Sequence, residues 1–504
     1  MRMTHETDVL KAENGDDLLP LFWELRERVC QAARAGMPVH EMEKAVWQQV
    51  LQIGRQALGQ FFALLGTGDL GETITLPDGQ SGQRLEQLHE RRYVSIFGEF
   101  KLQRTVYGSR EGQKLEFIPL DNRLQLPQAV FSYVLQDWDQ SFCVEQAFGP
   151  SAQAIARILG LRQSVDSLER LNEDMAGDVL DFWEERPLPK AAEEGEVLVT
   201  SADGKGIVMR REKPAAVPVH RGKGKKASQK RMATVGTVYT VDRYVRTPEE
   251  VVAALFRDGS PPTERRPEPQ HKHVWASLSC DDDEEPISSV DIVYTWLADQ
   301  VDKRDSGAAK ELVHLCDGQS YLWDAAQEYL PQENSTGILD IIHVASYVWQ
   351  AAHVFYQEGS DEAEAFVRER LLRILQGHSD RVVRGLREMG TKRGLTGAKK
   401  KTLHKVCAYM EGNRERMHYD VYLSKGYPIA SGVIEGACRH LVKDRMERAG
   451  MHWTPKGGQA MLQVRSMYVN GDWETYQSFR VDRETKRLYP FQELVQGERY
   501  PVAA

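Results

Sequence analysis

Apolar side chains in the first 65 residues recur at helical spacing. They form two runs on either side of Gly36–Pro38: Leu18, Leu21, Leu25 and Val29, then Met42, Ala45, Val46, Val50 and Ile53. A period of three to four residues predicts two helices between about residues 16 and 65. No side-chain pattern here indicates a chemical role, so residues 1–66 are assigned only as an N-terminal helical region.

Strand-like segments occur in two parts of the chain. Residues 93–107 alternate in character and turn near Gly98, which predicts a β-hairpin. Four later runs are rich in apolar and β-branched residues and predict buried strands: 197–200, 206–209, 233–240 and 311–316. Between them, Thr247–Glu250 opens a helix with a cap, a proline and two acids.

Two short helices are predicted between the hairpin and the later strands. The first is capped by Ser151 and ends at Gly160, and the second starts near Ser164. This layout is typical of a DNA-binding helix-turn-helix, in which Ser164 and Arg170 would face a groove. Any two short helices joined through a glycine look alike, so the pattern alone leaves both readings open. We assign residues 67–190 as a DNA-binding region.

The long interval 321–424 reads as almost entirely helical, including residues 338–349. A loop then runs into a further helix, with Ser431 as its N-cap and Glu435 in its first turn. We expect an α/β fold, in which residues 195–320 and 425–480 form a mixed sheet with flanking helices. A large all-helical insertion, residues 321–424, interrupts this domain. An N-terminal α+β region precedes the domain, and residues 481–504 form a C-terminal tail.

Charge along the chain is segregated into blocks. The chain has 504 residues, which is too many for a single hydrophobic core. Its formal charge is −9, and a negative net charge argues mildly against a nucleic-acid partner. However, residues 204–231 hold ten Lys or Arg and one acid, and residues 381–405 hold nine and one acid. Such runs suit phosphate binding, although a solvated surface is the alternative.

Cysteine usage and apolar content exclude several classes. The six cysteines include no CxxC pair, so neither a zinc ribbon nor a redox pair is indicated. The first 17 residues lack the apolar core of a signal peptide, and no stretch approaches the roughly 18 apolar residues of a membrane span. We expect a cytoplasmic protein with no membrane partner.

Three carboxylates stand at the ends of predicted elements. Asp203 and Asp317 each end an apolar run and precede a glycine, and Glu435 falls in the first turn of a helix. Glu435 could simply complement the helix dipole. If the strands are adjacent, however, the three would converge, and carboxylates favour hard cations such as Mg2+ or Mn2+. Two such ions could activate a water or a 3′-hydroxyl and stabilise the leaving oxygen.

The motifs resemble bacterial insertion-sequence transposases of the DDE type, specifically the ISKra-type group, which is related to Mutator-like transposases. Four ordered motifs within about residues 195–470 carry the resemblance: 201–206, 315–323, 338–349 and 431–453. The resemblance implies an RNase H-like catalytic core with a helical insertion before the last acid. It also implies that Asp203, Asp317 and Glu435 are the metal-binding and catalytic residues.

Further residues take their roles from the same resemblance. Asp340 and His343 match an Asp-x-x-His signature and, if helical, share a face; a structural hydrogen-bonded pair is the alternative to a catalytic role for His343. Trp349 matches a family tryptophan that would stack on an unpaired base, with core packing as the alternative. Relatives often carry cysteine pairs after the hairpin, but residues 107–112 have none, which argues against zinc there.

The resemblance implies double-stranded DNA as the partner, both the element's terminal repeats and the target, bound by a homodimer or higher oligomer in the nucleoid. The candidate DNA-binding residues are Ser164, Arg170, Lys223, Lys225, Lys226, Lys230, Arg231, Trp349, Arg439, Lys443 and Arg445. The expected reaction is DNA cleavage and joining, that is, transposition by DNA recombination. Two alternatives stay open: an RNase H-like nuclease or resolvase without strand joining, and a non-catalytic DNA-binding protein descended from a transposase.

Overall fold

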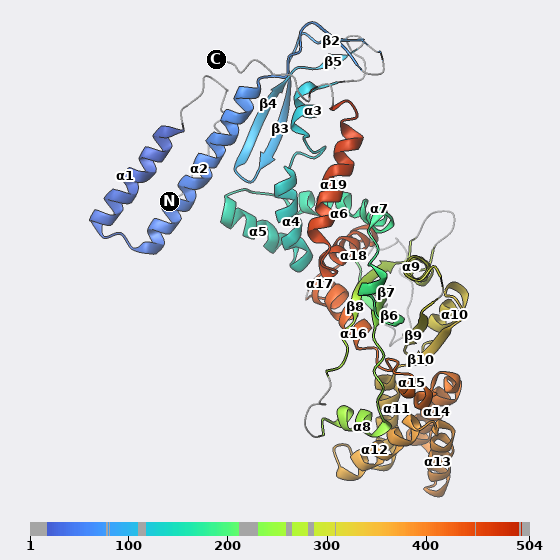
Figure 1. The fold of residues 1–504 in the computed structure, drawn as a ribbon. Helices are drawn as coiled ribbons and strands as arrows, with labels where there is room; N and C mark the ends of the chain where they lie inside the picture. Colours follow the sequence, from blue (N-terminus) through green and yellow to red (C-terminus); the bar gives the residue numbers. More distant parts are fainter. Residues whose placement is uncertain are drawn as a thin grey trace, which may run out of the picture. The chain divides into compact units, whose positions relative to one another are not determined.

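The computed structural model describes most of the chain and divides it into two compact units. Unit 1 comprises Met1–Asp178 and Trp473–Ala504, and unit 2 comprises Val179–Asp472 (Figure 1). The described residues are 18–76, 79, 81–108, 117–210, 230–258, 265–280, 287–307, 309–448, 450–492 and 495. Within them, no helix combines the length and the apolar character that a membrane crossing requires.

Unit 1 begins with the two helices that the apolar period predicts, α1 (Leu19–Ala35) and α2 (Val39–Leu65). Between them Gly36 adopts a left-handed conformation, with φ of 65°, that ends α1. The Phe62 ring of α2 packs edge-on against Phe100 of the neighbouring hairpin, at a centroid distance of 5.3 Å. Only Ala32 of α1 and Gln49 of α2 are buried.

The predicted hairpin is confirmed as β3 (His89–Ser95) and β4 (Gly98–Arg104), which pair antiparallel with Ser95 opposite Gly98. The sequence pattern missed a small second sheet because its strands are too short to show a period. Its three strands are β1 (Thr73–Thr75), β2 (Ser81–Arg84) and β5 (Tyr107–Gly108).

Short helices complete unit 1: α3 (Pro119–Leu124), α4 (Tyr133–Glu145), α5 (Phe148–Leu159), α6 (Val165–Ala176) and α19 (Trp473–Leu488). The expected cap of α5 is wrong, because α5 begins at Phe148 and the buried Ser151 donates its hydroxyl to the Ala147 carbonyl. Ser164 does cap α6, its oxygen accepting from the Ser167 amide at 3.1 Å. The expected tail is partly helical, because α19 runs on to Leu488.

Unit 2 contains a five-stranded mixed sheet, which confirms the expected α/β class. Its strands are β6 (Val197–Val208), β7 (Lys230–Val241), β8 (Gln270–Leu278), β9 (Glu311–Cys316) and β10 (Ser335–Leu339). The spatial order is β10-β9-β6-β7-β8, with β7 antiparallel to both neighbours and β9 parallel to β6 and β10. The two strands expected at 197–200 and 206–209 are one continuous strand, β6.

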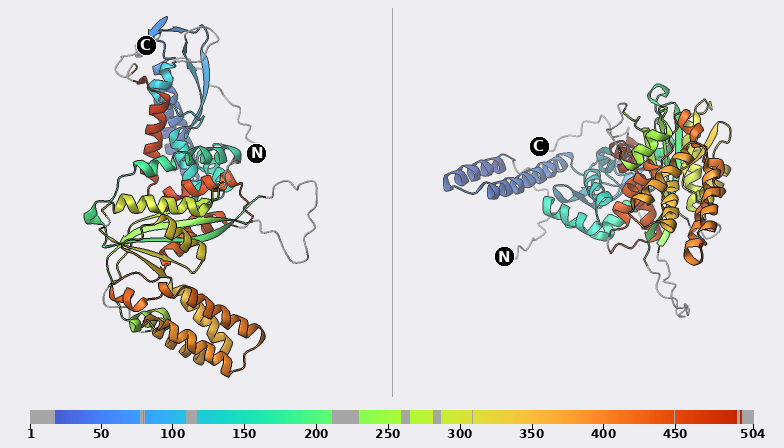
Figure 2. Two further views of the ribbon diagram at one scale, coloured as in Figure 1. Left: turned by 90° about the vertical axis from the view of Figure 1, so that its right-hand side faces the viewer. Right: turned by 90° about the horizontal axis from the view of Figure 1, so that it is seen from below.

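Helices cover both faces of this sheet (Figure 2). Trp275 and Leu278 of β8 are three residues apart, so they point to opposite faces. Trp275 packs against Trp296 of α9 (Ser289–Arg304) at 5.6 Å, and Leu278 lies against Gly458 of α18 (Pro455–Val469). The remaining helices around the sheet are α7 (Val179–Glu185), η1 (Ala191–Glu193), α8 (Pro248–Phe256), α10 (Ser320–Tyr329), α16 (Gly432–Ala437), η3 (Cys438–Lys443) and α17 (Asp444–Met446).

A helical layer adjoins the β10 edge and contains α11 (Ile341–Phe355), α12 (Asp361–Leu375), α13 (Ser379–Lys392), α14 (Gly397–Gly412), η2 (Arg414–Arg416) and α15 (Tyr419–Ser424) (Figure 1). Tyr419 joins it to the sheet by donating its hydroxyl to the Leu339 carbonyl at 2.7 Å. The expected strand-free interval 321–424 is wrong at its start, because β10 pairs within the central sheet. Five apolar or small residues show no period that separates a strand from a helix.

Candidate active site

Three aspartates lie at the same level of three neighbouring parallel strands. The register of β6 on β9 brings Asp203 level with Asp317, which follows β9 directly. Leu339 of β10 pairs with Cys316 of β9, so Asp340 comes level with Asp317 as well. Because neighbouring strands are about 4.8 Å apart, the three backbone positions lie side by side.

Asp203 occupies a half-buried position at one end of this row, on β6. Its carboxylate accepts hydrogen bonds from the Gly204 amide at 2.7 Å and from the Cys438 thiol at 3.4 Å. Burial raises the pKa of Asp203, and the charge of Asp317 raises it further, while His343 acts in the opposite direction. A carboxylate in these surroundings is stabilised by a nearby positive charge.

Asp317 is oriented by the turn that follows β9. One carboxylate oxygen accepts from the Gln319 amide at 3.0 Å, and the other accepts from the Gln319 side chain at 2.7 Å. The indole N–H of Trp323 donates to the Asp317 backbone carbonyl at 2.7 Å. These bonds fix the turn, so the carboxylate stays at the end of its strand.

Asp203 and Asp317 are each followed by a glycine, and at both positions a tyrosine occupies the space that a larger side chain would need. A Cβ added at Gly204 would lie 2.8 Å from the Tyr321 hydroxyl, and one added at Gly318 would lie 2.2 Å from the Tyr409 ring. Burial, together with the charges of the two aspartates, raises the pKa of Tyr321 to about 12. The two glycines therefore leave room for tyrosine side chains next to the backbone that follows each aspartate.

Asp340 is a buried helix cap and does not lie on a helix face as expected. Its carboxylate accepts from the Ile342 amide at 2.8 Å, from His343 Nδ1 at 2.9 Å and from the Ser431 hydroxyl. The hydrogen bond that His343 donates to Asp340 raises the pKa of His343, and the charges of Asp317 and Glu435 add to this effect. His343 is therefore held as a cation to a higher pH than an ordinary histidine.

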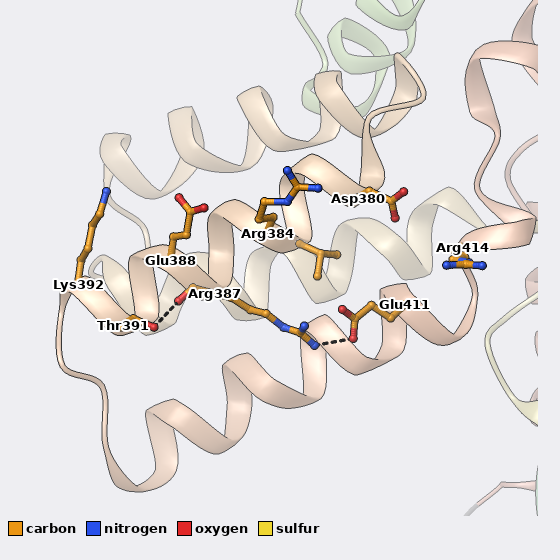
Figure 3. Close-up of a pocket in the computed structure, with 9 residues that line it drawn as sticks. Asp380, Arg384, Arg387, Glu388, Thr391, Lys392, Glu411 and Arg414 are labelled. Carbon is orange, nitrogen blue, oxygen red and sulfur yellow. Dashed lines mark hydrogen bonds and ion pairs between the residues drawn. The ribbon is translucent and has the colours of Figure 1, made fainter.

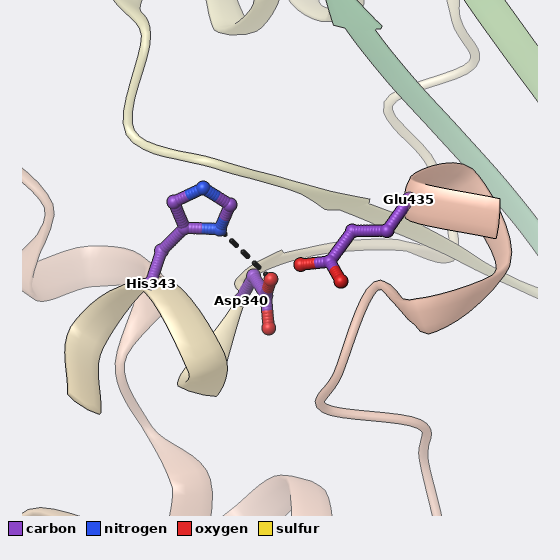
Figure 4. A group of neighbouring side chains, drawn as sticks. All are labelled: Asp340, His343 and Glu435. Atoms are coloured by element: carbon purple, nitrogen blue, oxygen red, sulfur yellow. Dashed lines mark hydrogen bonds and ion pairs between the residues drawn. The ribbon is translucent and has the colours of Figure 1, made fainter. Parts of the chain in front are cut away.

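Glu435 comes to the same place from the first turn of α16. Its exposed carboxylate points toward Asp340 and His343 (Figure 4). One ligand atom from each of these three residues lies within 4.8 Å of the other two. Ser431 precedes α16 at the N-cap position, but it gives its hydroxyl to Asp340 and makes no cap bond.

Of the three sequence-predicted acids, Asp203 and Asp317 lie level on adjacent strands, whereas the group whose ligand atoms come within 4.8 Å of one another joins Glu435 to Asp340 and His343. We call these five residues the acidic cluster. Sequence reasoning had named all five but did not foresee that Asp340 follows a third strand. Carboxylate oxygens predominate among the possible donors of these residues, and such oxygens fit Mg2+ or Mn2+. The Cys438 thiol beside Asp203 stays protonated, since burial raises its pKa.

The candidate DNA-binding residues lie in different surroundings. Lys223, Lys225 and Lys226 fall outside the described residues. Lys230 begins β7 and pairs with Glu447 at 3.1 Å, while Arg231 donates to the Ser279 carbonyl at 3.4 Å. Ser164 and Arg170 are exposed on unit 1, and Arg439 and Lys443 are exposed on η3.

Arg445 and Trp349 differ from the other candidates because they pack inside unit 2. Arg445 is fully buried, lies over the Trp453 ring at 4.9 Å and donates to the Met451 sulfur, so the expectation that it contacts DNA is wrong. Trp349 is half-buried between Phe256 and His353, at centroid distances of 6.2 and 5.7 Å. These neighbours fit the packing alternative for Trp349.

A cavity of about 600 Å³ lies between α13 and α14, and its lining includes the acids Asp380, Glu388 and Glu411 as well as several cations (Figure 3). Arg387 on its wall pairs with Glu411 at 2.5 Å. Three further cations line it: Arg384, Lys392 and Arg414. Arg384, Arg387 and Lys392 belong to the second basic run of the sequence, and they are exposed to solvent. The run therefore forms a charged surface on the helical layer.

Comparison with known proteins gives little beyond this geometry. No protein-family model and no curated protein sequence matches the chain. Among solved structures, the chain is similar to one titled "Drosophila P element transposase strand transfer complex", with 9% identity and a TM-score of 0.24. That alignment covers 73% of this chain and 88% of the other. A likeness of this size is too weak to carry an argument.

Proposed function

We propose that this protein is a DDE-type transposase that cleaves DNA at the ends of an insertion sequence and joins those ends to a target. The observation that carries the proposal is the acidic cluster: aspartates at one level of three adjacent strands, joined by a glutamate from a distant helix. Phosphoryl transfer on DNA needs several carboxylates fixed on rigid elements, and this cluster meets that need.

The proposed fold of unit 2 is RNase H-like. The sheet supports this, because its first three strands form an antiparallel meander and its last two run parallel to the first. The helical layer enters between the last strand and the helix that carries Glu435. This is the position that the resemblance to insertion-sequence transposases implies for a helical insertion.

Asp203, Asp317 and Glu435 would hold the divalent cations, two Mg2+ or Mn2+ ions. When bound, such ions activate a water or 3′-hydroxyl and stabilise the charge of the leaving oxygen. The raised pKa of Asp203 supports its role as a ligand, since an acid that is buried and lies near another carboxylate is stabilised in its charged form by a bound cation. Asp340 is a positioning residue that holds His343 through the bond to Nδ1.

His343 would act on the DNA through its positive charge. Its side chain is about 40% exposed, and its bond to Asp340 fixes the ring on the first turn of α11. A cation at this place can donate a proton to a phosphate oxygen and stabilise charge that develops there. This role explains why the buried Asp340 is committed to three hydrogen bonds rather than left free.

DNA binding would be separate from the acidic cluster. Ser164 and Arg170 at α6 in unit 1, and the exposed cations Arg384, Arg387 and Lys392 of α13 in unit 2, would contact the phosphates of duplex DNA. We further propose a homodimer formed through α1 and α2, because large apolar side chains on both helices are exposed. Four of these are Phe22, Trp23, Trp47 and Phe61.

A strand-joining assay tests the proposal. Duplex DNA carrying the sequences that flank the gene, end-labelled, is incubated with protein, a plasmid target and Mg2+ or Mn2+. A transposase yields cut ends and labelled plasmid, and EDTA abolishes both. Cut ends without labelled plasmid would indicate a nuclease, and binding without cutting would indicate a non-catalytic DNA-binding protein.

A further inference from the structure

Tyr321 brings a hydroxyl group to the sheet edge that holds Asp203 and Asp317. It lies in the first turn of α10, shortly after Asp317. A Cβ added at Gly204 would lie 2.8 Å from the Tyr321 hydroxyl oxygen, so this side chain reaches from the segment after β9 to the backbone of β6. Burial raises the pKa of Tyr321, and the charges of Asp317 and Asp203 raise it further, because the hydroxyl lies near both carboxylates.

This hydroxyl has no protein partner, and the residue that carries it is 39% exposed. Across the described ranges of the chain, the Tyr321 hydroxyl forms no hydrogen bond, while both aspartates accept from other groups. The neighbouring Tyr294 differs, because it is fully buried and donates its hydroxyl to the Leu322 carbonyl at 2.8 Å. Tyr321 therefore keeps a free O–H donor beside the two carboxylates.

A free donor at this place complements a phosphate group. Ionised carboxylates can only accept hydrogen bonds, so without bound cations they offer a phosphate oxygen no favourable contact. A phenol is neutral at pH 7 and donates one hydrogen bond, and tyrosine hydroxyls are among the groups that contact DNA phosphates. Packing against Gly204 would need only the ring, which phenylalanine would supply equally well, so packing does not account for the hydroxyl.

We propose that Tyr321 contacts the substrate by donating its hydroxyl to a non-bridging oxygen of the DNA phosphate at the acidic cluster. The inference rests on the proposed function and adds to it a residue that binds the reacting phosphate. The phenol keeps its proton throughout the reaction. Tyr321 therefore stabilises negative charge on the phosphate and forms no covalent bond to the DNA.

Removal of the hydroxyl alone tests this contact. Tyr321→Phe keeps the ring beside Gly204, so the packing is retained. In single-turnover cleavage of end-labelled DNA with Mg2+, we expect this variant to react about 10- to 100-fold more slowly, as the loss of a hydrogen bond to a charged group predicts. Tyr329→Phe is the matched control, because Tyr329 ends the same helix and its hydroxyl bonds to Asp291. The control should cleave like the parent, and cleavage by Tyr321→Phe at the parent's rate would overturn the proposal.

A second measurement needs no cleavage. 3-Fluorotyrosine replaces either Tyr321 or Tyr329 in the full chain, and its fluorine NMR signal is recorded with and without end DNA, with Ca2+ as the cation. We expect DNA to shift the signal at Tyr321 and to leave the signal at Tyr329 unchanged. If the Tyr321 signal shifts while the parent neither cleaves nor joins DNA, the contact stands and the proposed reaction falls. If the parent cleaves and joins but the Tyr321 signal does not move, the contact falls and the proposed reaction stands.

Discussion

The Asp203 carboxylate is held where its negative charge is costly. Burial and the neighbouring Asp317 both raise its pKa, so the folded state binds a proton at Asp203 more tightly than the unfolded state does. For an acid, this shift lowers stability at pH values above its folded-state pKa, where the carboxylate is charged. A bound cation would remove that cost, which gives the residue a measurable signature.

We predict that Asp203→Asn raises the melting temperature of the metal-free protein at pH 7 by a few degrees, a gain of the size that removing functional-site strain commonly gives. Mg2+ should raise the melting temperature of the parent but not that of the variant. Differential scanning fluorimetry of each protein, first without metal and then across a series of ten-fold dilutions of Mg2+, measures both effects. A variant that melts lower than the parent without metal would contradict the reading of Asp203 as a strained ligand.

The Asp340–His343 bond predicts the opposite pH dependence. His343 has a raised pKa, so the bond stabilises the folded protein fully below the unfolded-state value of about 6.5 and less as pH rises through the folded-state value. His343→Asn should therefore lower the melting temperature more at pH 6 than at pH 9. His404→Asn, on the exposed face of α14, serves as the control and should show no such difference. An equal fall in melting temperature at both pH values would show that the charged Asp340–His343 pair does not stabilise the fold.

At the scale of elements, α14 packs against the turn that follows β9 through the Tyr409 ring. Gly318 lies in the turn after β9, and a Cβ there would meet the Tyr409 ring of α14. Gly318→Ala should therefore cost about 1–3 kcal/mol in stability and disturb the Asp317 turn. Gly385→Ala on α13 is the matched control: a Cβ added at Gly385 would meet no neighbouring group within 4 Å, so the change should stabilise the protein by up to about 1 kcal/mol.

Urea unfolding measures both glycine variants. Adding Tyr409→Ala to Gly318→Ala should recover part of the loss that comes from the clash, because the double variant removes the ring that the new Cβ meets. A Gly318→Ala variant as stable as the parent would show that the α14 ring does not lie against this turn. The result would then weaken the link between the helical layer and the acidic cluster.

The sequence revealed the elements of the sheet better than their pairing. Strands β6 and β9 were visible because apolar runs end at Asp203 and Asp317, but β10 was not, since Ser335–Leu339 is short and without period. Asp340 comes level with Asp317 through the register of β10 on β9. This register joins distant segments, so no local sequence pattern predicts it. The burial of Arg445 was also hidden, because it depends on Trp453 folding back over the guanidinium.

At the scale of the whole molecule, α1 and α2 predict self-association. Phe22 and Trp23 are 51% and 60% exposed on a helix that buries only Ala32. Pairing with the same helices of a second copy would bury these side chains in a helical bundle. Phe22→Glu combined with Trp23→Glu should convert a dimer to a monomer in analytical ultracentrifugation. Leu188→Glu, an isolated exposed apolar position, should remain dimeric; monomeric parent protein would contradict the prediction.

The most direct test of the central claim compares two glutamates that sit alike in their helices. Glu435 is exposed in the first turn of α16, within the acidic cluster, and Glu362 is exposed in the first turn of α12, outside it. Each is changed to Gln, which keeps the shape and removes one negative charge. DNA binding and strand joining are then measured on the same end-labelled DNA.

We predict that Glu435→Gln binds the DNA as tightly as the parent but loses at least 100-fold in both cleavage and joining, since charge stabilisation at the reacting phosphate contributes about that much or more. Glu362→Gln should bind, cleave and join like the parent. Joining by Glu435→Gln at the parent's rate would contradict the proposal that the acidic cluster carries the reaction.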